Sequence, residues 1–231
     1  MLSVCLGVVT HELDRVTTYH RSVIETGPFL SQQTLKPQIY YSTMQPTPEN
    51  IIVLYRQRGN EIYGDEKVTQ AEHAIQSAVL AERQGASDEQ ILAALLHDIG
   101  HILAEDKLPA SNQENLDDGH ENRAYHWLCE HFGKGIADPI RLHVSAKRYL
   151  CTVTPEYCET LSPTSYKSYL DQGGPMSELE LQLFRQEPFY QQAIALRRWD
   201  DQAKDAEMVI PDIAHYAGRL QAGLDKSNSS R

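Results

Sequence analysis

Histidine and carboxylate side chains occur in this chain at spacings typical of a metal centre. His97 and Asp98 are adjacent and directly follow the apolar segment 91–96. His101 lies four residues after His97, which places the two imidazoles on one helix face, one turn apart. A histidine and a carboxylate that are buried together need a compensating partner, because unpaired polar groups are costly in an apolar interior. A metal ion is the natural partner for this pair.

Further histidines and one aspartate complete a candidate ligand set. Four imidazoles and two carboxylates are too many ligands for one small ion but suit two, and Asp98 is the candidate to bridge them. Imidazole and carboxylate ligands without cysteine suit iron, manganese or zinc, and ligand chemistry alone does not choose among these metals. The candidate ligands are His73, His97, Asp98, His120, His143 and Asp200.

Cationic residues share the helical register of these ligands. Lys147 is four residues after His143, and Arg197 is three residues before Asp200. Together with His101 they could bind an anion, since Arg and Lys form short charge-assisted bonds to anionic oxygens such as those of carboxylate or phosphate. Each cation alone would be read as a solvated surface charge, but the shared register favours the binding role.

Helix signals dominate from residue 48 onward. Thr69 and Glu72, Ser87 and Gln90, and Ser177 and Glu180 have the spacing of capping boxes. We expect an all-α, single-domain helical bundle. The expected helices lie at about 70–84, 119–132 and 188–206, and others begin at Asp138-Pro139, Ser162-Pro163, Ser177 and Pro211.

Composition limits the class of protein. The 231 residues can bury one sizeable core, and the net charge of −11 argues against a nucleic-acid binder, which needs a basic surface. The sequence contains no run of eighteen apolar residues, and its four cysteines are irregularly spaced, as reduced thiols are. The first residues lack the basic start of a secretory signal, so we expect a cytoplasmic enzyme without a membrane partner.

Amino-acid composition and helix-cap signals change along the chain and suggest how it is divided into segments. Residues 1–46 are rich in Thr, Ser, Val and Tyr without helix caps, and we expect a poorly ordered extension there, with Met44 as an alternative start. The catalytic domain is expected at 47–225. The segment 226–231 is polar and is expected to be a frayed tail.

From about residue 48 to 220, the chain resembles the HD-domain mixed-valent diiron oxygenases of phosphonate breakdown, and more distantly myo-inositol oxygenase. The resembling stretches are 63–66, 70–73, 95–101, 141–150, 172–176 and 196–201. The resemblance implies two iron ions, Fe(II) and Fe(III), with O2 as co-substrate. It further implies the distribution of ligands, with one ion held by His73, His97, Asp98 and Asp200, and the other by Asp98, His120 and His143.

The resemblance also implies roles at the substrate. Tyr63 and Glu66 would form a movable latch, with Glu66 facing a substrate cation, and an acid beside an aromatic ring does suit an ammonium group. Without the resemblance, Tyr63 could equally be a helix-start tyrosine and Glu66 an exposed acid. Ser165 would contact the phosphonate. The implied catalytic residues are Tyr63, Glu66, His101 and Lys147, and the implied substrate contacts are Glu66, His101, Lys147, Ser165 and Arg197.

The expected function is therefore oxygenase cleavage of the C–P bond of a 1-hydroxy-2-aminoethylphosphonate, as primary amine or trimethylammonium compound. The products would be inorganic phosphate and glycine or betaine. The alternative is a metal-dependent phosphohydrolase acting on a nucleotide or phosphate monoester, which would release phosphate without O2. A non-catalytic regulatory domain is disfavoured because the ligand set is complete. The sequence leaves the oligomeric state, the stereochemistry and the nature of the amine open.

Overall fold

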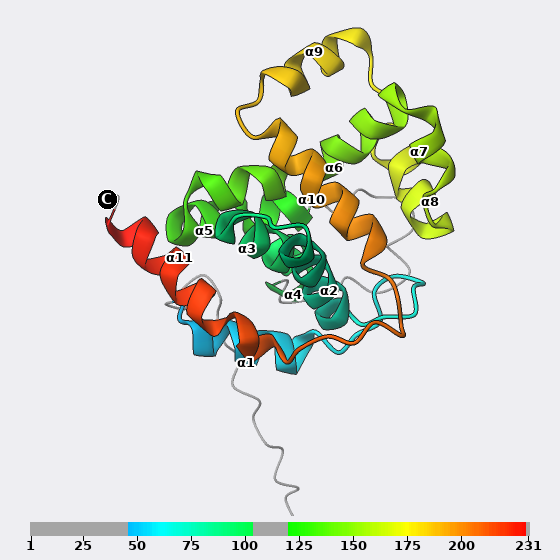
Figure 1. Ribbon diagram of the computed structural model, residues 1–231. Coiled ribbons are helices and arrows are strands. Elements are labelled where there is room, and N and C mark those ends of the chain that lie inside the picture. Colours follow the sequence, from blue (N-terminus) through cyan, green and yellow to red (C-terminus); the bar gives the residue numbers. More distant parts are fainter. Residues whose placement is uncertain (1–45, 104–119, 230–231) are drawn as a thin grey trace, which may run out of the picture. The chain divides into compact units, whose positions relative to one another are not determined.

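The chain is folded from helices, as Figure 1 shows for the described part of the computed structural model, residues 46–103 and 120–229. Side chains are described for these residues except at 120–123. Apart from one isolated bridge between Ile62 and Thr69, the regular elements of this part are helical, which confirms the predicted all-α fold. The elements are α1 (Pro48–Arg58), α2 (Gln70–Arg83), α3 (Asp88–Leu96), α4 (Ile99–Leu103), α5 (His120–Phe132), α6 (Lys134–Val153), α7 (Pro155–Glu159), α8 (Pro163–Asp171), α9 (Glu178–Gln186), α10 (Tyr190–Gln202), the 3-10 helix η3 (Ile213–Tyr216) and α11 (Ala217–Ser229).

Local hydrogen bonds set the starts of the helices that carry the candidate site. The Thr69 hydroxyl accepts from the Glu72 backbone N–H (3.2 Å), and the Glu72 carboxylate accepts from the Thr69 N–H (2.7 Å). The same reciprocal bonds join Ser87 and Gln90 before α3. Both capping boxes are therefore confirmed, and α2 and α3 begin where the sequence predicts.

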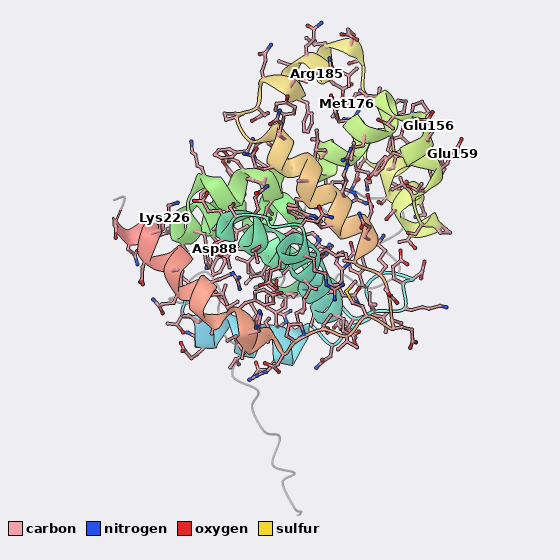
Figure 2. All side chains as sticks on the ribbon, in the orientation of Figure 1. Asp88, Glu156, Glu159, Met176, Arg185 and Lys226 are labelled. Carbon is pink, nitrogen blue, oxygen red and sulfur yellow. The ribbon has the colours of Figure 1, made fainter. Side chains whose placement is uncertain are left out.

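The core lies where the longest helix meets its neighbours. α6 packs against α5 and α10, while α2 and α3 pack on each other and on α10 (Figure 1). Fully buried leucines from α3 and α5, such as Leu95 and Leu128, fill the main core, and a second small core forms around Phe184 of α9. Side chains occupy the space between the ribbons (Figure 2). The junction of α2, α3, α6 and α10 positions the candidate ligands.

The predicted boundaries of α6 and α10 are wrong. The helix predicted to begin at Asp138-Pro139 starts at Lys134 and contains Pro139, directly after Gly133 with its positive φ of 77°. Pro139 lacks only the bond to a carbonyl in the first turn, and burial of Ile136 and its neighbours offsets that loss. The helix predicted for 188–206 stops at Gln202, which puts Lys204 in the following loop.

The structure also differs from the prediction at the C-terminal end of the chain. The expected frayed tail is wrong for residues 226–229, because α11 continues to Ser229. Lys226 Nζ donates to Glu89 Oε1 at 2.5 Å, and Ser227 Oγ donates to the Glu130 carbonyl at 3.2 Å. Figure 2 labels Lys226 beside Asp88, where α11 meets the start of α3.

Some predictions cannot be compared with the structure. Residues 1–45, which make up almost all of the expected extension, lie outside the described residues, as does residue 119, where the helix predicted for 119–132 was expected to begin. The last helix begins with η3, capped by Asp212, rather than at Pro211. Within the described ranges, no helix combines the length and the apolar character needed to cross a membrane.

Candidate metal centre

Three buried imidazoles lie close together, and in each of them the same ring nitrogen is held by the backbone. His73 on α2, His97 at the end of α3 and His143 on α6 are 0%, 0% and 2% exposed. In each ring Nδ1 lies within hydrogen-bond distance of a backbone carbonyl, which can only accept, so Nδ1 carries the hydrogen. Each Nε2 is therefore left as a lone pair. The carbonyls are those of Ala203, Ala94 and Ile140, at 2.8, 2.8 and 2.7 Å respectively.

These lone pairs face one another and two carboxylates. The Nε2 atoms of His73 and His97 are 3.1 Å apart. Asp98 Oδ2 lies 3.4 Å from His97 Nε2, and Asp98 Oδ1 lies 3.9 Å from His143 Nε2. Burial lowers the pKa of His97, against the opposing charges of Asp98 and Asp200, and so favours the neutral ring. Lone pairs and carboxylates at these distances repel unless a cation lies among them.

The second carboxylate is held in place by an arginine. Asp200 is 1% exposed, and Arg197 Nη1 donates to its Oδ2 at 2.6 Å. Burial raises the pKa of Asp200, but the Arg197 guanidinium and the adjacent imidazoles prevail and hold that pKa well below its usual range. Asp200 Oδ1 accepts no hydrogen bond from the described residues, and its neighbour is His73 Nε2 at 3.3 Å. This buried oxygen is oriented as a metal ligand is.

The donor set therefore fits a metal ion. Ligand atoms of His73, His97 and Asp98 all lie within 4.8 Å of one another, and all three residues are buried. Asp200 and His143 border this group from α10 and α6 through the distances given above. Neutral imidazoles and carboxylates are ligands that first-row transition metals accept.

The predicted ligands come together with one exception. His73, His97, Asp98, His143 and Asp200 form one connected cluster. The sixth, His120, begins α5, and its side chain lies outside the described residues, so its role stays a prediction.

His101 lies close to the cluster but not on the continuous helix that its spacing suggests. α3 ends at Leu96 and α4 begins at Ile99, so His97 and Asp98 occupy the turn between two helices. The His101 backbone N–H donates to the Asp98 carbonyl at 3.0 Å, and its side chain is half-buried.

The predicted anion-binding cations have different surroundings. Arg197 directs its guanidinium at carboxylates, with Nη1 on Asp200 and Nη2 on Asp201. Lys147, 2% exposed, donates from Nζ to Ser168 Oγ at 2.6 Å. Burial, and then the nearby charge of Arg197, lower the pKa of Lys147 to about 7. Lys147 is thus the buried cation whose only hydrogen-bond partner among the described residues is a neutral hydroxyl.

The predicted latch residues lie beside the cluster. The Tyr63 ring stacks on the His73 imidazole, with centroids 3.8 Å apart and an angle of 13° between the planes. Burial and the charge of Asp98 raise the pKa of Tyr63 well above its usual value, so the phenol keeps its proton. Glu66 accepts from Ser162 Oγ at 2.6 Å and lies 3.3 Å from Lys204 Nζ.

Sequence reasoning missed Lys204, whose Nζ also donates to Ser165 Oγ at 2.7 Å. Lys204 follows the candidate ligand Asp200 by four residues, just as Lys147 follows His143. The same spacing rule applied to Asp200 would therefore have identified Lys204 from the sequence. Asp201, the residue after Asp200, was given no role at the site from the sequence. It instead accepts from Tyr157 and Arg197 and so completes the support of Asp200.

Comparison with known proteins gives a consistent result. Residues 70–165 match the family described as HD domain. The chain is 43% identical over 178 residues to the hydroxymethylphosphonate dioxygenase of Gimesia maris, an alignment that covers 77% of this chain and 88% of the relative. It is 42% identical over 173 residues to the glycine-betaine-forming [1-hydroxy-2-(trimethylamino)ethyl]phosphonate dioxygenase of Leisingera caerulea. This alignment covers 75% of this chain and 88% of that relative.

Proposed function

This chain belongs to the HD-domain phosphonate dioxygenases, a family of oxidoreductases, and on that premise we propose that it cleaves the C–P bond of a 1-hydroxyphosphonate with O2. Inorganic phosphate is one product. The substrates of the two named relatives share a hydroxyl on the carbon bonded to phosphorus and differ in whether they carry an ammonium group. Both kinds are candidates here, and an aminated substrate would yield glycine or betaine.

We propose two iron ions, Fe(II) and Fe(III), as the cofactor. His73, His97, Asp98 and Asp200 hold one ion, and Asp98, His120 and His143 hold the other. The convergence of three imidazole Nε2 lone pairs on two buried carboxylates is the observation that carries this proposal. Bound there, the irons supply the Lewis acidity and the one-electron chemistry that a reaction with O2 requires.

The protein's own residues bind and orient the substrate. The Lys147 ammonium holds the phosphonate, with Ser165 and His101 as further contacts. The contacts of Arg197 support an indirect role, in which it positions the Asp200 carboxylate rather than the substrate. Tyr63 covers His73, and Glu66 closes the same side, so the latch excludes water from the reacting carbon.

Phosphate release measured in air and under nitrogen tests the function. We expect release from a 1-hydroxyphosphonate in air, with O2 consumed, and none under nitrogen. Release that is equal in both atmospheres would contradict the oxygenase and support the phosphohydrolase.

A matched pair of variants tests the metal centre. Asp98→Ala should lose iron and activity, because it removes the carboxylate shared by both proposed ions. Asp225→Ala, at an exposed site on α11, is the control and should keep the wild-type iron content and activity. Metal analysis with an electron paramagnetic resonance spectrum of the anaerobic protein checks the mixed-valent state, and a single iron per chain would contradict the two-ion proposal.

A further inference from the structure

A lysine of the chain occupies the surroundings suited to a substrate ammonium group. Lys204 Nζ lies 3.3 Å from Glu66 Oε1 and 5.9 Å from the centroid of the Tyr63 ring. A carboxylate and an aromatic ring are the groups that stabilise an ammonium ion. The side chains of Lys204 and Glu66 are only 12% and 16% exposed, so solvent screens this pair weakly.

Hydroxyls of α8 and the turn before it hold the pair in place. Ser162 Oγ donates to Glu66 at 2.6 Å, and Lys204 Nζ donates to Ser165 Oγ at 2.7 Å. The Glu66 carboxylate therefore accepts a hydrogen bond from Ser162, and the Lys204 ammonium balances its charge. A substrate ammonium would have to displace Lys204 or face its like charge.

The other carboxylates described at the site have partners of their own. Asp201 accepts from Arg197 and Tyr157, and Asp200 faces Arg197 on one oxygen and His73 on the other. Asp98 lies among the imidazoles. Among these carboxylates, Glu66 is the one that pairs with a lysine of the chain, Lys204.

The same lysine adds positive charge where the phosphonate is proposed to bind. Lys147 Nζ and Lys204 Nζ donate to Ser168 and Ser165, which lie one turn apart on α8. The two ammonium groups interact electrostatically, and the charge of Lys204 contributes to lowering the pKa of Lys147. Two cations that both bond to serines of α8 favour a phosphonate dianion and disfavour a substrate that carries its own cation.

We infer that the substrate is a hydroxyalkylphosphonate without an ammonium group, and that Lys204, paired with Glu66, sets this preference. This inference rests on the proposed function and narrows its substrate class. For hydroxymethylphosphonate the reaction balances as HOCH2PO3H2 + O2 → HCOOH + H3PO4. The C–P bond, one C–H bond and the O–O bond break, while new C–O, P–O and O–H bonds form. The carbon is oxidised to formic acid, and O2 accepts the electrons, with both of its oxygen atoms entering the products.

Calorimetric titration of the iron-loaded protein under nitrogen measures the preference without turnover. The ligands are hydroxymethylphosphonate, 1-hydroxyethylphosphonate, 2-amino-1-hydroxyethylphosphonate and 1-hydroxy-2-(trimethylamino)ethylphosphonate. The second ligand separates chain length from charge, because it has the two-carbon chain of the aminated compounds but no amine. We expect the two amine-free ligands to bind at least tenfold more tightly than the aminated ones.

Variants assign the preference to Lys204. Lys204→Met should reduce the ratio of the affinity for amine-free ligands to the affinity for aminated ligands by at least tenfold, because it leaves the Glu66 carboxylate without its cation. Lys204→Arg keeps the charge and should keep the preference. Lys167→Met, an exposed lysine on the same helix α8 as the two serines, is the control and should change nothing. Wild-type protein that binds an aminated ligand as tightly as the amine-free ones would overturn the inference, as would an unchanged ratio in Lys204→Met.

Phosphate release in air separates this inference from the proposed function. A binding preference without O2-dependent phosphate release from any of the four compounds would refute the function and leave the preference standing. Equal release from aminated and amine-free compounds would refute the preference and leave the function standing. Failure of all four phosphonates to bind would refute the proposed function and the substrate preference together.

Discussion

The backbone carbonyl of Ala203 accepts the Nδ1 hydrogen of His73, 130 residues earlier in the chain, at 2.8 Å. Ala203 is the C-cap of α10 and is fully buried, so the end of one helix sets the tautomer of an imidazole on another. The next residue is Lys204, which pairs with Glu66. The point where α10 stops therefore orients a candidate ligand and positions the lysine proposed to select the substrate.

Loss of one imidazole should empty the candidate centre. His73→Ala removes the Nε2 lone pair that faces both His97 and Asp200. We expect less than about a tenth of the wild-type metal to remain, because changes even to the groups that only support metal ligands typically cost tenfold to hundredfold in metal affinity. Metal analysis of the purified protein measures this loss. His126→Ala, at an exposed histidine of α5, is the control. Wild-type metal content in His73→Ala would mean that His73 is no ligand.

Removal of the metal should lower thermal stability. Without a cation, the lone pairs and carboxylates of the cluster repel, and binding of metal to the folded state alone adds about 2.7 kcal/mol at a free concentration of 100 times Kd. We expect the melting temperature to fall on chelation and to return when iron is added back under nitrogen. Differential scanning calorimetry measures both steps, and a melting temperature insensitive to chelation would contradict a bound ion.

Replacement of Arg197 should destabilise the fold as well as the centre. Arg197→Leu leaves the buried Asp200 carboxylate without its cation, and breaking a buried pair in this way costs about 3–5 kcal/mol. Its neighbour Arg198 is exposed, and Arg198→Leu should stay within about 0.5 kcal/mol of wild type. Urea unfolding gives both values. Equal stability of the two variants would show that the ion pair contributes nothing.

Lys147 should make stability depend on pH. Its pKa falls from 10.5 in the unfolded chain to about 7 in the folded protein, chiefly through burial. Between these values the unfolded state binds the extra proton, so the free energy of unfolding rises as pH increases from about 7 towards 10.5. The burial cost of the charged form is present in full below about pH 7.

Comparison with Lys147→Met isolates this effect. The variant has no ammonium group to deprotonate, so the difference in unfolding free energy between wild type and variant should change over that pH range. Urea unfolding at several pH values measures the difference, and parallel curves would contradict the lowered pKa. The same deprotonation should weaken phosphonate binding in the wild type above about pH 7.

The capping box of α9 should affect stability without affecting the centre. Ser177 Oγ accepts from the Glu180 N–H, and the Glu180 carboxylate accepts from the Ser177 N–H. Ser177→Ala should cost about 1 kcal/mol and leave metal content unchanged. The Ser177 donors, aided by Arg148, lower the pKa of Glu180 from 4.5 to about 2, so this contribution is present above pH 4.5 and lost as the pH falls towards 2. Urea unfolding at pH 7 and pH 3 checks both statements, and a change in metal content would show that α9 is coupled to the centre.

Local signals in the sequence were sufficient for the helical bundle and for several boundaries. The capping boxes at Thr69, Ser87 and Ser177 form as predicted, because a hydroxyl and a side chain three residues later need no distant partner. The boundary at Asp138-Pro139 was wrong because a helix can include proline when tertiary burial compensates, and burial is not visible in a local motif.

The sequence by itself determined which residue types could form the centre: imidazoles and carboxylates at helical spacings, with cations in the same register. Only the tertiary structure decided which cationic side chain pairs with which carboxylate. Arg197 pairs with Asp200 and Asp201, whereas Lys204 crosses to Glu66, 138 positions away in the chain. The difference has a physical cause, because ion pairing depends on distance in space. That distance follows from where α10 ends, which brings Lys204 to Ser162 and Ser165 at the start of α8, and no spacing along the chain encodes it.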